Sequence, residues 1–125
     1  MINLYNSMLV VVGSAIGGGC RFWISTLIQK QSNGSFPFGT FTVNMIGCFA
    51  IGWVAAMSSK NSTDQTSLML LMATGFCGGF TTFSAFAMEN VQLIKNGWNL
   101  HSAAYILSSV VMGILLVKMG LTLVK

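Results

Sequence analysis

Apolar residues occur along this chain in four long runs, separated by short polar segments. The runs cover Met8–Ile28, Phe38–Met57, Leu68–Met88 and Ala103–Val124. A helix needs about 20 mostly apolar residues to span the hydrocarbon layer of a bilayer, and each run reaches that length. The charged residues inside the runs are Arg21 and Lys118. The pattern predicts an all-α membrane protein with four transmembrane helices.

The segments between the runs carry turn signals. QSNGSFPFG contains Gly34 and the only proline, Pro37, whose fixed φ suits the first turn of a helix. SSKNSTDQTS is polar throughout, and KNGWN places Gly97 in a short turn. No basic residue precedes Met8, so we expect no cleavable signal peptide. The four helices use nearly all 125 residues, and we expect one domain over residues 1–125.

The composition supports a membrane protein. Hydrophobic residues make up 54% of the chain and charged residues 6%, against roughly 25% charged residues in a soluble domain. No basic cluster suggests binding to nucleic acid. Cys20, Cys48 and Cys77 each lie within a predicted span, which favours packing roles over a disulfide or a zinc site.

The basic residues are nearly balanced between the two sides of the membrane. Both termini and the Ser58–Thr66 loop share one side, which holds Lys60, Lys118 and Lys125. The other side holds Lys30, Lys95 and, near the end of the first span, Arg21. An excess of Lys and Arg on the cytoplasmic side normally sets orientation. Without it the chain can insert both ways and pair with its own inverted copy.

The third run contains a candidate helix break. Gly78 and Gly79 stand in its middle, followed by Thr81, Thr82 and Ser84. The alternative is an unbroken helix packed through its glycines, because Gly75 and Gly79 repeat the GxxxG spacing of Gly13 and Gly17 in the first run. Non-helical backbone at membrane depth must be buried or line a cavity. Its free carbonyls can coordinate a cation such as Na⁺.

Phe83 and Phe86 lie three residues apart, on one face of a helix. They are either ordinary packing residues or part of an anion pathway, because the edge of an aromatic ring is positive. Ser84 would supply a hydroxyl beside them, and Asn44 is the only side-chain amide in the second run.

Other polar residues lie inside the runs or at their ends. Arg21 and Glu89 are either interfacial anchors or functional residues. The last run has a hydroxylated strip formed by Tyr105, Ser108 and Ser109. His101 stands alone and makes no metal site.

Three segments resemble the motif blocks of the Fluc/CrcB family of fluoride channels. They are GGGCR at Gly17–Arg21, FGTFTVNMIG at Phe38–Gly47 and GFCGGFTTFSAF at Gly75–Phe86. Their order, their spacing, the four-helix layout and the total length also match, so the resemblance covers essentially the whole chain. It implies a fluoride-selective channel, not an enzyme, that gives passive efflux across the inner membrane of a prokaryote.

The resemblance also implies an assembly and a set of site residues. Two antiparallel subunits would form a homodimer with two pores along the interface. A central structural Na⁺ would be held by main-chain oxygens at Gly78 and Thr81. Pore and vestibule positions match Asn44, Phe83, Phe86, Ser84, Tyr105 and Ser109, with Arg21 and Glu89 at the vestibule or pore end. Ala85 stands where family members often carry a hydroxyl, which leaves the number of donors beside the rings open.

Two other classes of protein fit the sequence less well. A small multidrug-type transporter also has four short helices, but its proton coupling needs a carboxylate inside the first span, and the first run has none. A non-transporting membrane assembly protein would not require the Gly-Gly and Thr-Thr pairs beside Asn44 and two phenylalanines. An enzyme is disfavoured because no nucleophile–base pair or metal cluster stands out.

Overall fold

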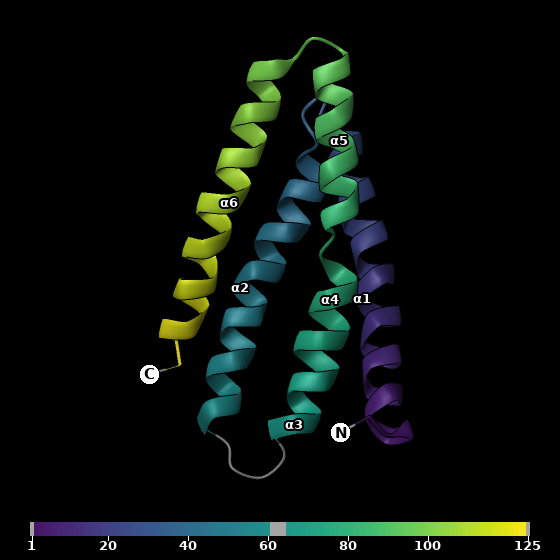
Figure 1. Cartoon of the computed structure of the whole chain (residues 1–125), viewed down its shortest axis with the longest axis vertical. Helices are drawn as coiled ribbons and strands as arrows, with labels where there is room; N and C mark the ends of the chain where they lie inside the picture. Colours follow the sequence, from purple (N-terminus) through teal and green to yellow (C-terminus); the bar gives the residue numbers. More distant parts are fainter. Residues whose placement is uncertain (1, 61–64, 125) are drawn as a thin grey trace.

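The computed structural model describes residues 2–60 and 65–124, and within them the regular structure is all helical (Figure 1). The helices are α1 (Leu4–Gln31), α2 (Phe38–Lys60), α3 (Gln65–Leu68), η1 (Met69–Cys77), α4 (Gly78–Phe80), α5 (Phe83–Lys95) and α6 (Asn99–Thr122). Four stretches are long and apolar enough to cross a membrane, namely Leu4–Gln31, Phe38–Ser59, Gln65–Lys95 and Asn99–Thr122. The prediction of four spanning helices is confirmed.

The connections alternate between the two ends of the bundle. The N-terminus, the end of α2, the start of α3 and the C-terminal end of α6 lie at one end (Figure 1). The α1–α2 and α5–α6 connections lie at the other end. Of the predicted loop Ser58–Thr66, residues 61–64 lie outside the described residues, as does Lys125.

Glycines form the contact between α1 and the third span. A Cβ atom on Gly17 would lie 2.9 Å from the backbone nitrogen of Phe80, and one on Gly79 would lie 2.9 Å from the Cα of Ser14. We call this contact the glycine seam, formed by Gly13, Gly17, Gly75 and Gly79. The two backbones touch directly, as the four-residue spacing predicts.

The third span changes its backbone geometry twice. η1 is a π-helix, which was not predicted. α4 then ends at Phe80, and the backbone is extended at Thr81 (φ −91°, ψ 158°) and Thr82 (φ −149°, ψ 124°). The side chain of Thr82 caps α5, because its hydroxyl accepts the Ala85 N–H at 3.3 Å.

The turn from α5 into α6 depends on Gly97. Its φ of 80° lies in the left-handed region, which glycine adopts without steric strain. The Trp98 N–H donates to the Leu93 carbonyl at 2.8 Å, and the Gly97 N–H donates to the Ile94 carbonyl at 3.0 Å. This pair of hydrogen bonds is a Schellman motif. It ends α5 and directs α6 back along the bundle (Figure 1).

Little of the apolar surface is buried inside the chain. Val43 and Tyr105 are fully buried. In contrast, Phe22, Trp23 and Leu107 are 66%, 72% and 67% exposed. Apolar side chains that face outward over the whole length of a helix bundle are suited to contact with lipid or with another transmembrane subunit.

Candidate functional site

Asn44 on α2 holds the extended segment of the third span. Its Oδ1 accepts the Thr82 N–H at 2.9 Å, and its Nδ2 donates to the Thr82 carbonyl at 3.2 Å. The side-chain amide thus pairs with both backbone groups of one residue, as a neighbouring strand would. Lipid offers no partner to a free backbone group, so this pairing satisfies the extended segment within the span.

Two backbone carbonyls lose their helical partners here. In an uninterrupted α-helix the Thr82 N–H would donate to the carbonyl of Gly78, and the Ala85 N–H to the carbonyl of Thr81. Instead, the Thr82 N–H donates to Asn44 and the Ala85 N–H to the hydroxyl of Thr82. The carbonyls of Gly78 and Thr81 are therefore available to another ligand. Oxygens of this kind suit a hard cation such as Na⁺.

A groove of about 470 Å³ runs beside the extended segment, between α2, the third span and α6. Six of the predicted site residues line it: Asn44, Gly78, Thr81, Phe83, Phe86 and Ser109. The hydroxyl oxygen of Ser109 is buried and has no hydrogen-bond partner among the described residues. Because the oxygen is covered, only rotation of the Ser109 side chain would bring its hydroxyl into the groove.

Three aromatic rings follow one another away from the groove. Phe83 is 79% exposed, and its ring centroid lies 5.9 Å from that of Phe86. The ring of Phe86 meets Tyr105 edge-to-face, with centroids 4.8 Å apart. Ser84 is exposed, and its hydroxyl lies 3.3 Å from that of Thr82. The predicted phenylalanine pair is thus continued by a tyrosine from α6.

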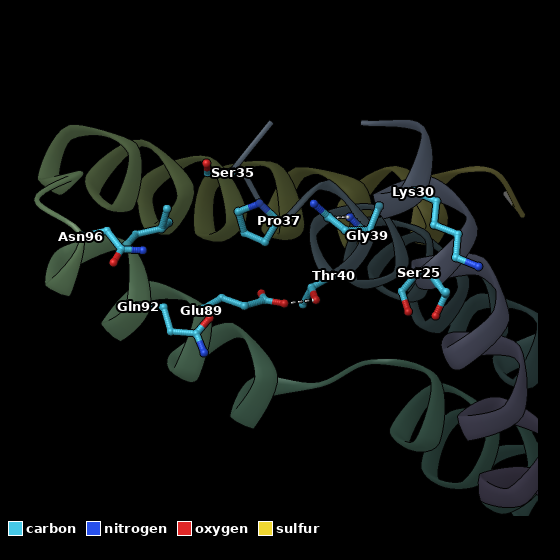
Figure 2. Close-up of a pocket in the computed structure, with 12 residues that line it drawn as sticks. Ser25, Lys30, Ser35, Pro37, Gly39, Thr40, Glu89, Gln92 and Asn96 are labelled. Atoms are coloured by element: carbon cyan, nitrogen blue, oxygen red, sulfur yellow. Dashed lines mark hydrogen bonds between the residues drawn. The ribbon is translucent and has the colours of Figure 1, made fainter. Parts of the chain in front are cut away.

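A second cavity of about 550 Å³ lies at the end of the bundle where α1, α2 and α5 meet. Most of the residues that line it are polar, and Figure 2 shows Glu89 extending from α5 toward Thr40 on α2. One carboxylate oxygen of Glu89 accepts the Thr40 hydroxyl at 2.5 Å, and the other accepts the Tyr105 hydroxyl at 2.8 Å. Lys30 adds a positive charge to the lining.

Tyr105 connects the groove to the second cavity. Its ring contacts Phe86, which lines the groove, while its hydroxyl contacts Glu89, which lines the cavity. Phe86, Tyr105 and Glu89 therefore form one continuous line of side chains from the groove to the second cavity.

Arg21 is not part of that line. It lines neither the groove nor the second cavity, whereas Ser25, one turn further along α1, lines the cavity. The Ser25 hydroxyl donates to the Arg21 carbonyl at 2.6 Å. The role of the Arg21 side chain stays a prediction.

Several polar residues of the site were not predicted. Thr40 could have been found, because it lies four residues before Asn44 on the same face of α2. Asn90 and Ser102 form a buried hydrogen bond of 2.8 Å between α5 and α6. Gln29 donates to the Phe36 carbonyl and accepts the Gly39 N–H. No sequence signal separates these residues from ordinary polar residues near the ends of helices.

Comparison with known proteins finds one family over most of the chain. Residues 8–121 match the family described as CrcB-like protein, Camphor Resistance (CrcB). A relative from Methylobacillus flagellatus, named fluoride-specific ion channel FluC, is 46% identical over 98% of this chain and 96% of its own length. Relatives of the same name from Chlorobium phaeobacteroides and Oceanobacillus iheyensis are 42% and 37% identical, each over 94% of this chain. These two matches cover 91% and 90% of the lengths of the relatives themselves.

The four apolar spans and these relatives identify a multi-pass integral protein of the prokaryotic plasma membrane. The match extends over every span that carries the groove and the second cavity, at 46% identity to the first of these relatives. The chain therefore belongs to the CrcB-like family.

Proposed function

We propose that this protein is a fluoride-specific ion channel that gives passive efflux of fluoride. The observation that carries the proposal is the line of side chains from the groove to the second cavity, in a chain whose relatives are named fluoride-specific channels. The groove offers a small anion the edges of Phe83 and Phe86 and, after rotation of its side chain, the hydroxyl of Ser109. A pathway of this kind acts without any covalent chemistry, so the protein is a channel and not an enzyme.

Passive transport suits the chemistry of fluoride. Hydrogen fluoride is a weak acid that crosses membranes as the neutral molecule and ionises inside the cell, so fluoride accumulates there. The negative membrane potential then drives the anion outward, at about 2.3 kcal/mol per charge for each 100 mV. A channel of this kind needs no coupling residue. Glu89, the carboxylate on the path, already accepts a hydrogen bond at each oxygen.

The functional unit in this proposal is an antiparallel homodimer of one four-helix domain, residues 1–125, with two pores along the interface. In this proposal the third span is a helix that is broken at its centre. Phe83 is 79% exposed in the single subunit, and the groove beside it is open on one side. A second subunit that covers this face would turn each groove into a closed pore.

A structural Na⁺ at the centre of the dimer is the second part of the proposal. The carbonyls of Gly78 and Thr81, which have lost their helical N–H donors, would hold it, two from each subunit. Four neutral oxygens suit a monovalent hard ion better than a metal that prefers nitrogen or sulfur. When bound, it supplies a positive charge that offsets the carbonyl dipoles.

Flux from liposomes tests the proposed function. Purified protein is reconstituted with internal fluoride or chloride, and the release of each anion is followed with a selective electrode. We expect rapid fluoride release and no chloride release above that of protein-free liposomes. Equal release of the two anions, or no fluoride release from a well-folded preparation, would contradict the proposal.

The antiparallel arrangement has its own test. Reporter domains fused after Lys125 should be found on both sides of the membrane, because the basic residues are nearly balanced between the two sides. If every fusion faces the same side, the antiparallel dimer is wrong.

A further inference from the structure

A buried polar pair joins α5 to α6 one turn away from the line of pore side chains. Asn90 is 6% exposed and Ser102 is 2% exposed. The Ser102 hydroxyl donates to Oδ1 of Asn90 at 2.8 Å. The Nδ2 of Asn90 donates to the carbonyl of Phe86, also at 2.8 Å. Both ends of the Asn90 amide are therefore fixed.

The pair lies where it can set the position of α6 against α5. Asn90 follows Glu89 in α5, and Ser102 stands one turn before Tyr105 in α6. The two contacts that link groove and cavity, Tyr105 to Glu89 and Tyr105 to Phe86, both cross the same helix interface. A shift of α6 along its axis would separate the Tyr105 hydroxyl from the carboxylate and its ring from Phe86. A single hydrogen bond between buried groups opposes that shift.

The turn between the helices does not fix this position by itself. The Schellman motif at Gly97 sets the direction of the chain where α5 ends, but Trp98, which precedes α6, has no side-chain capping bond. The first side-chain hydrogen bond between the two helices is the one from Ser102 to Asn90, and the next is the one from Tyr105 to Glu89.

We infer that Asn90 and Ser102 are positioning residues for the anion pathway: they hold Tyr105 in register with Glu89 and Phe86. The inference rests on the proposed function, because it assigns these residues a part in the same pathway. Neither residue touches the groove or the second cavity, so neither contacts the permeating ion.

Substitution of Ser102 tests the inference through fluoride flux. Ser102→Ala removes the hydroxyl and should lower fluoride flux per folded channel about tenfold, the change expected from the loss of one intramembrane hydrogen bond of good geometry. Ser102→Thr keeps a hydroxyl and should retain most of the flux. Ser58→Ala is the matched control, because Ser58 is also buried but bonds the Gln65 carbonyl at the other end of the bundle. It should leave flux unchanged.

Combination with Tyr105→Phe separates positioning from a general loss of stability. If Ser102 acts through Tyr105, the flux loss of the double variant should be smaller than the product of the two single losses, because residues of one hydrogen-bonded network are coupled. Flux losses that multiply, or unchanged flux in Ser102→Ala, would overturn the inference. If Ser102→Ala does not fold, Ser102→Cys, with its weaker donor, takes its place under the same criteria. A wild-type protein without fluoride flux would contradict the proposed function instead.

Discussion

The two halves of the third span are held in different ways. The half from Gln65 to Phe80 contacts α1 through the glycine seam, where backbone meets backbone. The half from Phe83 to Lys95 is tied to α2 and α6 by side-chain hydrogen bonds, from Thr40 and Tyr105 to Glu89 and from Ser102 to Asn90. The extended residues Thr81 and Thr82 separate the two halves.

The two halves also differ in what they line. The half from Gln65 to Phe80 lines the groove with small residues such as Thr74 and Gly78. The other half adds the rings of Phe83 and Phe86 to the groove and the carboxylate of Glu89 to the second cavity. Close packing of small residues gives a rigid contact, whereas larger polar and aromatic side chains can offer contacts along a path.

The largest effect is expected at the glycine seam. Gly17→Val would place side-chain atoms against the backbone of Phe76 and Phe80. The resulting loss of stability should exceed the roughly 1–3 kcal/mol that ordinary overpacking costs. We expect little or no folded protein by size-exclusion chromatography. Gly19→Val is the control, because a Cβ at Gly19 meets nothing within 4 Å. Normal folding of Gly17→Val would show that the seam is not a rigid support.

The next effect concerns the phenylalanines of the other half. Phe83→Ile and Phe86→Ile keep an apolar side chain but remove the positive ring edge. Each should lower fluoride flux by at least about tenfold, or roughly 1.4 kcal/mol, while the protein still folds and dimerises. Flux from liposomes measures this, with Phe22→Ile, a change at an outward-facing residue of α1, as the control. Unchanged flux in both variants would indicate that Phe83 and Phe86 are packing residues.

An intermediate effect is expected from Na⁺, where the two halves join. Dimers in detergent should become less stable when Na⁺ is replaced by a large organic cation, and K⁺ should restore stability only weakly. Thermal unfolding after prolonged dialysis is the measurement, because a buried ion can leave slowly. The same unfolding temperature in all three cations would contradict the proposed central ion.

The smallest effect distinguishes the two threonines between the halves. Thr82→Val removes the cap of α5 and should cost about 1 kcal/mol, because the Ala85 N–H loses its acceptor. Thr81→Val should cost less than about 0.5 kcal/mol, since the Thr81 hydroxyl only adds a second donor to the Cys77 carbonyl, which already accepts the Thr81 N–H. Unfolding temperatures of the two variants give the comparison, and the reverse order would contradict it.

The four spans could be predicted because the bilayer imposes a simple rule on length and polarity. The packing of the glycine seam also followed from its spacing. The π-helix could not be predicted, because the apolar sequence Met69–Cys77 does not differ from that of an ordinary transmembrane α-helix.

The candidate site was predictable where a polar residue is unusual. Asn44 stood out as an amide inside an apolar run, and it binds the extended segment of the third span. Thr40 and Ser102 did not stand out, because a hydroxyl near the end of a helix can also bond to its own backbone. Only the fold shows that their partners are Glu89 and Asn90.

The glycine seam also has an entropic consequence. A contact built from glycine fixes no side-chain rotamers when it forms, whereas each hydrogen bond around Glu89 orders a carboxylate, a hydroxyl or a phenol. The seam orders fewer side-chain groups, among them the Ser14 hydroxyl that donates to the Gly75 carbonyl at 3.3 Å, so its loss of side-chain entropy is smaller than that of the polar half. As the membrane warms, α5 should loosen from α2 and α6 before η1 separates from α1.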